Sequence, residues 1–200
     1  MPADRRLGSD HADENAIIAQ CLAGDRKSYA VLVERYKELV HDLVYRMIGD
    51  AVRAEDIAQD AFVKAYLSLR DFRGESRFST WLCRIAMNRC KDTLRRARRE
   101  ILMPGGADGE PHLPDSVDEG QTPAATLERR EREAVLQRAL ARLPVKYRDA
   151  VVLRHIEGMD FRAVGSVLGI AAGAAKVRTF RGRKMLRKLL EREGFRDDAI

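Results

Sequence analysis

The sequence predicts an all-α protein made of two small helical domains joined by a flexible acidic linker. Apolar residues recur at spacings of three and four over most of the chain, which is the period of an amphipathic helix. Between residues 101 and 127 this pattern stops, and the composition changes to four prolines, four glycines and five acids without lysine or arginine. The expected division is a first domain at 1–99, a linker at 100–127 and a second domain at 128–200.

Helical periodicity divides the first domain into four segments. A short helix is expected around 17–22, a long one at 27–48, a third at 51–70 and a fourth from 78 to 99. No strand-like alternation interrupts them. The segment at 72–79, which contains a glycine and two serines, breaks the period and predicts a loop between the last two helices.

The second domain contains the pattern of a helix-turn-helix. Two helices separated by Pro144 are expected within 127–156. A helix of barely two turns at 161–168, a glycine and a long basic helix at 171–193 follow them. A short helix, a tight turn and a longer helix make up this DNA-binding motif.

Turn residues stand at the joints between these segments. Asp25 and Asp50 are placed to cap the helices that follow them, because aspartate accepts hydrogen bonds from free first-turn amides. Gly49 is expected to end the long helix. In the helix-turn-helix, Gly165 lets the two helices approach closely and Gly169 can adopt a positive φ in the turn.

Basic residues gather in the last helix. The whole chain has a net charge of +6, but the segment 176–188 carries seven cations almost without an acid. Such a face fits a polyanion, although a basic helix face is more often simply solvated. In a helix-turn-helix the second helix enters the major groove, so Lys176, Arg178 and Arg181 are candidates for base contact, and Val177 for a thymine methyl.

An acidic face is expected on the third helix. Asp56, Gln59 and Asp60 lie three and four positions apart, so they share one side on which basic groups of a partner helix could pair with them. An ordinary exposed acidic face is the alternative. A catalytic carboxylate pair is the poorest interpretation, because no histidine, metal-ligand set or phosphate loop accompanies these residues.

Metal, disulfide and membrane chemistry are not expected. Cys21, Cys83 and Cys90 lie in apolar helical surroundings without the CxxC spacing of a zinc site, and we interpret them as core thiols. No run approaches the ~18 apolar residues of a membrane span, and the N-terminal segment has no apolar stretch of a leader. The sequence predicts a cytoplasmic protein that is not an enzyme and has no cofactor.

Four ordered motifs resemble the extracytoplasmic-function (ECF) sigma factors, an RpoE-like class within the sigma-70 family. They are AGDRKSYAVLVERY, AEDIAQDAFVKAY, FRGESRFSTWLCRIAMNRCKDTLRR and LPVKYRDAVVLRHIEGMDFRAVGSVLGI. The resemblance implies sigma region 2 in the first domain and the region 4 helix-turn-helix in the second. It implies promoter-specific transcription initiation for a stress or envelope response. The implied partners are core RNA polymerase, duplex and non-template single-stranded promoter DNA, and an anti-sigma factor.

Site residues follow from the same resemblance. The clamp of the polymerase's largest subunit would meet Asp56, Ile57, Gln59 and Asp60. The minus-10 strand would meet Phe72, Arg73, Arg77, Phe78, Arg84, Asn88 and Lys91, since aromatic groups beside cations suit an unpaired strand. The minus-35 duplex would meet Gly173, Lys176, Val177, Arg178, Phe180, Arg181 and Lys184.

Several alternatives stay open at the level of the sequence. Trp81 is either a core residue or a platform for a base, and the linker is either an inert tether or an acidic mimic of a nucleic-acid strand. The alanine-rich entry at 171–175 and Thr179 depart from the family pattern, and Gly182 should weaken its helix by about 1 kcal/mol relative to alanine. A free-standing helix-turn-helix regulator is the second hypothesis, and an enzyme acting on nucleic acid the third.

Overall fold

The computed structural model of the chain describes residues 11–102 and 123–193. All regular elements within these ranges are helical, as predicted. The N-terminal half contains α1 (His11–Leu22), α2 (Arg26–Ile48), α3 (Ala51–Leu67), the short 3-10 turn η1 (Leu69–Asp71) and α4 (Phe78–Leu102). The C-terminal half contains α5 (Pro123–Arg142), α6 (Val145–Val151), the π-type turn η2 (Val152–Ile156), α7 (Phe161–Leu168) and α8 (Ala172–Arg192).

The predicted caps organise the N-terminal half. The Asp25 carboxylate accepts a hydrogen bond from the Lys27 amide at 2.9 Å, and the Asp50 carboxylate accepts one from the Arg53 amide at 3.0 Å. Gly49 has a φ of +80°, and its amide donates to the Tyr45 carbonyl. Each aspartate satisfies a first-turn donor that the helix cannot satisfy itself. Cap and turn together fold α3 back along α2.

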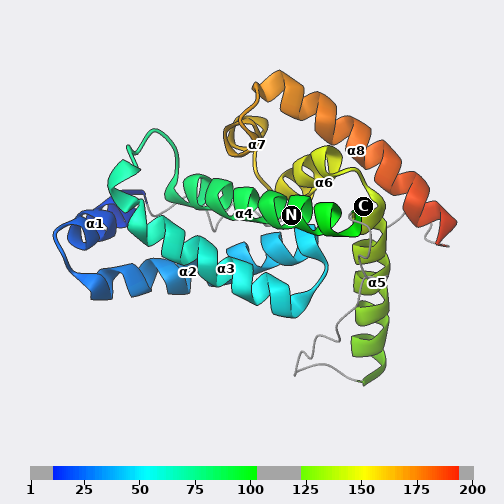
Figure 1. The fold of residues 1–200 in the computed structure, drawn as a ribbon, viewed down its shortest axis with the longest axis horizontal. Coiled ribbons are helices and arrows are strands. Elements are labelled where there is room, and N and C mark those ends of the chain that lie inside the picture. The colour runs from blue at the N-terminus through cyan, green and yellow to red at the C-terminus, as the bar shows by residue number, and fades with distance from the viewer. Residues whose placement is uncertain (1–10, 103–122, 194–200) are drawn as a thin grey trace.

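The core of the N-terminal half lies between α2, α3 and α4. These three helices pack against one another, and α1 packs on α2. The largest side chains that are completely buried in this core are Leu32, Leu43, Met47, Phe78, Leu82 and Met87. In Figure 1, α4 crosses the molecule with α2 and α3 on one side and α6, α7 and α8 on the other.

A helix-turn-helix forms the outer part of the C-terminal half. α7 and α8 meet at a bend of 96°. Gly169 ends α7 with a φ of +67°, and a Cβ at Gly165 would lie 2.6 Å from the Ile170 carbonyl oxygen. Both glycines therefore have the roles that the sequence predicts, one in the turn and one in the close approach.

Gly182 has a packing role that the sequence did not reveal. A Cβ at this position would lie 2.6 Å from Val151 Cγ2 and 3.0 Å from the Tyr147 carbonyl oxygen. Its missing side chain lets α8 lie against α6. Thr179 is buried as well, and its hydroxyl donates to the Ala175 carbonyl at 2.9 Å. Thr179, which departs from the family pattern, is therefore packed within the C-terminal half.

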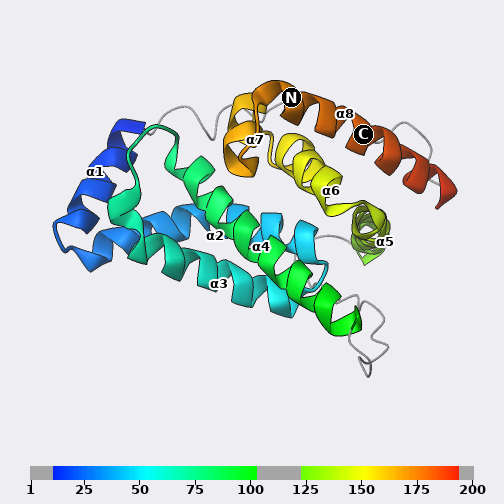
Figure 2. The same ribbon diagram turned by 45° about the horizontal axis from the view of Figure 1, so that its top comes forward.

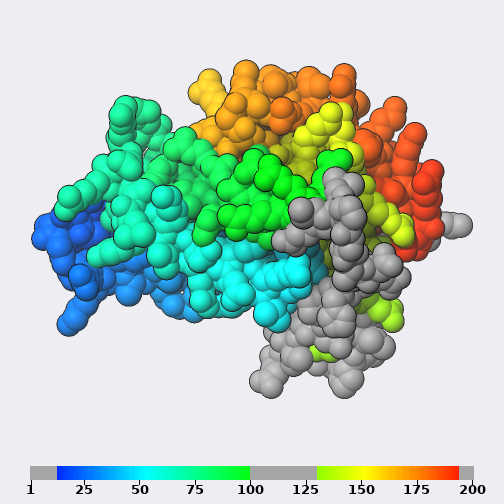
Figure 3. Space-filling view, in the orientation of Figure 1, coloured from blue at the N-terminus to red at the C-terminus, as the bar shows by residue number. Residues whose placement is uncertain are grey.

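The two halves lie against each other in the described chain. α4 packs on α7, and α2 contacts both α5 and η2. Figure 2 shows α4 crossing α2, with α6 and α7 beside them, and in Figure 3 the surfaces of the two halves run into one another. The acidic linker predicted at 100–127 falls largely at 103–122, outside the described residues. α4 extends to Leu102, and α5 begins at Pro123.

Candidate protein and nucleic-acid interfaces

The acidic face predicted on the third helix is the outer side of α3. Asp56 and Gln59 are exposed, and the Gln59 amide donates to Glu55 Oε1 at 2.8 Å. Asp60 is exposed and pairs with Arg89 of α4 at 2.5 Å. Ile57 is only 8% exposed and lies in the core. Its contact with a partner stays a prediction, and in the chain alone Ile57 supports this face from beneath.

Apolar residues that the sequence analysis missed extend the same face. Val52, Val63 and Leu67 are 72%, 58% and 73% exposed. Together with Asp56 and Gln59 they follow spacings of four, three, four and four along α3, which places them in one stripe. The spacing was visible in the sequence, but only the packing of α3 on α2 shows that this stripe faces outward.

The aromatic turn between η1 and α4 is held by a cluster of rings. The Phe72 and Phe78 centroids are 5.7 Å apart, and the Trp81 ring lies 5.4 Å from Phe72 and 5.6 Å from Phe78. Phe78 is completely buried and Trp81 is 7% exposed. Trp81 is thus a core residue here. The contact of Phe78 with DNA stays a prediction, and in the chain alone its ring has no accessible face.

Polar residues of this turn and of α4 remain at the surface. Arg73 and Arg77 are exposed, while Phe72 is half-buried. Arg84 and Asn88 are exposed one turn apart on α4, so they share a side of the helix. The loop and the helix thus present amide and guanidinium groups around a buried aromatic centre. Such groups can contact phosphates and base edges of an unpaired strand.

Lys91 lies one turn beyond Asn88 but is engaged within the chain. Its Nζ lies 3.2 Å from Oδ2 of Asp149, a carboxylate of α6 that is 2% exposed. Burial raises the pKa of Asp149, while Lys91 and Arg178 act in the opposite direction. The structure therefore joins a residue predicted to contact DNA in one half to a buried acid in the other.

The outer face of α8 is basic with apolar residues among the cations. Phe180 is 71% exposed and Val177 is 50% exposed. The other exposed residues of this predicted surface are Gly173, Lys176, Arg181 and Lys184. Arg178 is half-buried and lies toward Asp149 of α6, so it stands beside this face and not at its centre.

The first turn of α8 is open. Ala171 precedes the helix in an extended conformation and provides no side-chain cap, and the predicted alanine-rich entry forms regular helix from Ala172 onward. Ala175 of this turn is completely buried. The free amides of the first turn are therefore left to other acceptors, such as a phosphate group.

The three cysteines are buried thiols. Desolvation raises the pKa values of all three, that of Cys90 to about 12. They are therefore protonated at neutral pH and poorly suited to metal ligation. Within 11–102 and 123–193, no group of three potential ligands could hold a metal ion. No single helix in these ranges is long and apolar enough to cross a membrane, although α7 and α8 together reach that length and composition across their bend.

Comparison with known families defines the class of protein. The model of Sigma-70 region 2 matches residues 32–100, and the model of Sigma-70, region 4 matches residues 133–186. The first match covers most of α2 with α3 and α4, and the second covers the second half of α5, α6, α7 and most of α8. Fold and surfaces thus define a transcription initiation factor of the sigma-70 type.

Individual relatives narrow this class. The chain is 36% identical over 176 residues to the ECF RNA polymerase sigma factor SigW of Bacillus subtilis, covering 86% of this chain and 94% of that protein. It is 30% identical over 186 residues to the ECF RNA polymerase sigma-E factor of Escherichia coli K12, covering 89% and 94%. The chain belongs to the ECF sigma factors of RNA polymerase.

Solved structures agree with this assignment. CnrH, solved with the cytosolic domain of CnrY, is 26% identical with a TM-score of 0.66, over 89% of this chain and 97% of that chain. The sigma factor RpoE from Bartonella quintana shares the fold, with 22% identity, a TM-score of 0.68 and coverage of 82% and 98%. None of these comparisons supports the free-standing regulator. Sigma factors direct transcription initiation and are not catalysts.

Proposed function

We propose that residues 1–99 act as sigma region 2, residues 128–200 as sigma region 4 and residues 100–127 as the tether between them. In this division the first domain recruits core polymerase and engages the minus-10 strand, and the second reads the minus-35 duplex. The observation that carries the proposal is the presence of both family matches in one chain, with an acidic outer face on α3 and a basic outer face on α8.

The α3 face is proposed to dock on the clamp of the polymerase's largest subunit. Asp56, Gln59 and Asp60 supply hydrogen-bond acceptors and negative charge to a basic partner helix. Val63 and Leu67 add exposed apolar area beside them. In such an interface the apolar centre provides affinity and the complementary charges fix the orientation of the two proteins. This combination suits a subunit that binds specifically and must dissociate after initiation.

The turn before α4 and the outer side of α4 are proposed to engage the minus-10 strand. Arg73, Arg77 and Arg84 can neutralise phosphates, and the Asn88 amide can read the edge of an unpaired base. Phe72 is half-buried, so one part of its ring is available for contact. Lys91 joins this set when it leaves Asp149.

The basic face of α8 is proposed to lie in the major groove of the minus-35 element. Lys176, Arg181 and Lys184 are exposed along it, and the uncapped first turn with Gly173 allows a close approach to the backbone. Val177 and Phe180 can contact thymine methyl groups. Arg178, also assigned to this contact, would reach DNA from the side of the helix.

An inhibitory protein partner is proposed as well. CnrH, which covers most of the chain, was solved in complex with the cytosolic domain of CnrY, and the family resemblance points to an anti-sigma factor. The factor would act in the cytoplasm, where polymerase and promoters are, and would serve a stress or envelope response. The factor would contribute only the recognition of polymerase and promoter, and the polymerase would catalyse bond formation.

A binding experiment tests the proposal. Purified core polymerase should retain the chain in a pull-down, and the double variant Asp56→Lys/Gln59→Lys should lose most of this retention. Glu34→Lys on α2 is a matched control, since Glu34 is also an exposed acid that pairs only with Lys37 of its own helix in the described chain. Absence of retention by the folded wild-type chain, or equal loss with the control, would contradict the proposal.

A further inference from the structure

A run of arginines covers the end of α4, beyond the residues assigned to the minus-10 strand. Arg95, Arg96, Arg98 and Arg99 follow closely on one another, and all four are exposed. Cations at the C-terminal end of a helix are favoured by its macrodipole, but that effect falls off within the last turn. Arg95 and Arg96 lie more than one turn before the end of α4 at Leu102. The run therefore carries more charge than the helix end requires.

The arginines continue the outer side of α4 that carries Arg84 and Asn88. At about 100° per residue, positions 84, 88, 95 and 99 fall within about 60° of one another around the helix axis. All four positions are exposed. The side of α4 that is proposed to engage the unpaired strand therefore extends to the end of the helix.

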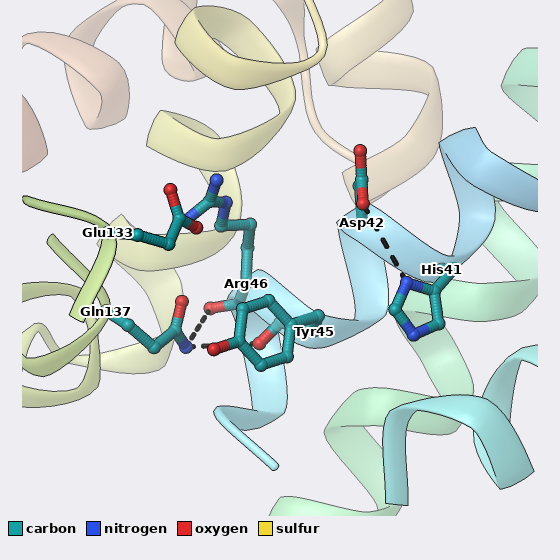
Figure 4. A network of polar contacts seen from close by, with 6 residues as sticks. All are labelled: His41, Asp42, Tyr45, Arg46, Glu133 and Gln137. Carbon is teal, nitrogen blue, oxygen red and sulfur yellow. Dashed lines mark hydrogen bonds and ion pairs between the residues drawn. The ribbon is translucent and has the colours of Figure 1, made fainter. Parts of the chain in front are cut away.

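Most of this run has no partner among the described acids, whereas other cations of the chain are engaged across helix contacts. The engaged pairs are Arg89 with Asp60, Lys91 with Asp149, and Arg46 with Glu133 (Figure 4). In the described chain the one ion pair of the run joins Arg95 Nη2 to Asp92 Oδ1 at 2.8 Å. Its side chains are 66% and 47% exposed, so the pair is weak and can exchange for another anion. The run is thus available to an external anion.

The composition of this end of α4 fits a phosphate backbone. Guanidinium groups bind phosphate oxygens through two parallel hydrogen bonds. Binding of unpaired bases also uses aromatic side chains for stacking, and residues 91–102 contain none. The rings of Phe72 and Phe78 lie at the other end of α4. The two ends of the outer side therefore suit different parts of a promoter, an unpaired strand near Arg84 and Asn88 and a duplex at the arginines.

The length of α4 gives the distance between these two parts. At 1.5 Å per residue, Arg95 and Arg99 lie about 10 and 16 Å along the helix from Asn88. At roughly 3.4 Å per base pair, this distance corresponds to about three to five base pairs. The chain continues from this end of α4 to the half that is proposed to read the minus-35 element, so the arginines lie on the upstream side of Asn88.

We propose that Arg95, Arg96, Arg98 and Arg99 bind the phosphate backbone of the promoter duplex immediately upstream of the opened minus-10 strand. This inference rests on the proposed function, because it places the duplex relative to the strand that Asn88 contacts. The contact does not depend on sequence, since phosphates carry no base information. α4 then spans the junction between duplex and unpaired strand, and it holds the upstream edge of the opened region at a fixed distance from Asn88.

The test measures the binding of core polymerase, loaded with the full chain, to two DNA probes. Both probes carry the minus-10 strand unpaired, from a promoter whose transcript appears on overexpression of the chain. The forked probe adds the spacer duplex without the minus-35 element, and the other probe has no duplex. The variant Arg98→Gln/Arg99→Gln removes two charges from the run. Arg26→Gln/Lys27→Gln is the matched control, because it removes the same charge from two exposed residues at the start of α2.

The variant should bind the forked probe roughly tenfold more weakly at about 0.1 M salt, and its salt slope should fall by about two, one for each lost phosphate contact. It should bind the probe without duplex as the wild type does, and the control should match the wild type on both probes. Arg98→Lys/Arg99→Lys keeps the charge and should recover most of the affinity. Thermal unfolding of each variant checks that the fold is intact.

Equal affinity and equal salt slope of variant and wild type on the forked probe, with normal transcripts, would overturn the duplex contact and leave the proposed function intact. An equal loss on both probes would overturn it in favour of the unpaired strand. Loss of core polymerase binding without DNA would overturn it in favour of an acidic protein surface. Failure of the wild type to bind either probe together with core polymerase would overturn the proposed function itself.

Discussion

Lys91 Nζ of α4 lies 3.2 Å from Asp149 Oδ2 of α6, so a cation of region 2 is paired with a buried acid of region 4. Lys91→Met should lower the free energy of unfolding by about 1–3 kcal/mol, because Asp149 would stay buried without its partner. The double variant Lys91→Met/Asp149→Leu should recover much of this loss, since no charge is then stranded. Urea unfolding of both variants measures the difference, and equal stability of the two would contradict a coupled pair.

Two glycines of α8 should respond to alanine with opposite signs. Gly182→Ala should destabilise the chain by about 1–3 kcal/mol, because the new methyl group would clash with Val151 and the Tyr147 backbone. Gly173→Ala meets no atom within 4 Å and should stabilise it by up to about 1 kcal/mol through helix propensity. Thermal unfolding of the two single variants checks the contrast. A stabilising Gly182→Ala would show that α6 and α8 are not held this closely.

Glu157 should make the free energy of unfolding sensitive to pH. Burial and, to a smaller extent, Asp42 raise the pKa of Glu157 to about 7, while Arg46 acts in the opposite direction. The Cys83 thiol of α4 nearby is neutral. The folded chain therefore keeps a proton that the unfolded chain releases between about pH 4.5 and 7, and the free energy of unfolding falls as the pH rises through this window.

Glu157→Gln should remove that part of the pH dependence. The measurement is urea unfolding between about pH 5 and 8, taken as the difference between the wild type and the variant. This difference cancels His155, whose pKa is lowered by burial and which therefore destabilises the fold as the pH falls. The wild type should lose stability relative to the variant as the pH rises. A difference that does not change with pH would contradict the prediction.

The apolar residues of the α3 stripe should contribute to polymerase binding. Leu67→Ser and Val63→Ser should each weaken core binding by roughly tenfold, since a buried aliphatic side chain contributes about 1.5–3 kcal/mol. Both side chains are mostly exposed, so the free energy of unfolding should hardly change. Val31→Ser on α2, where Val31 is 47% exposed, is the matched control. An equal effect from Val31→Ser would show that the stripe is not the interface.

The basic face of α8 should divide into base and phosphate contacts. Phe180→Ala should relax the preference for a thymine at one upstream position while leaving the salt dependence of binding unchanged. Lys188→Ala, further along the helix, should weaken all sequences alike and reduce the salt slope by about one. Binding to a library of duplexes at several salt concentrations separates the two. Identical behaviour of both variants would refute the division.

Much of this architecture could be predicted from the sequence, because its signals are local. The aspartate caps, Gly49 and Gly169 follow from turn chemistry, and apolar periodicity predicts the helices that they separate. Other features depend on what lies across a contact. Phe78 and Ile57 are buried by neighbours that periodicity does not specify. From the sequence alone Gly182 only weakens its helix, and its packing role becomes clear when α6 is seen beside it.

The contact between the halves is the largest feature that the sequence did not reveal. Arg148 sits in a helical pattern where a cation normally faces solvent, and nothing nearby in the sequence indicates that it binds Met47 at a separation of 101 residues. Lys91 is likewise predicted from the sequence to contact DNA, and only the structure shows that it pairs with Asp149. Such pairings follow from tertiary packing, whereas the DNA-binding and polymerase-binding faces are helix stripes that a sequence pattern can describe.

Run-off transcription with purified core polymerase tests the central claim most directly. The chain should produce a defined, promoter-dependent transcript from core enzyme that makes none alone, and Asp56→Lys/Gln59→Lys should abolish it while the isolated region 4 still binds duplex DNA. Failure of the folded wild-type chain to bind core polymerase or to direct any transcript, under conditions where an unrelated sigma factor does both, would contradict the claim.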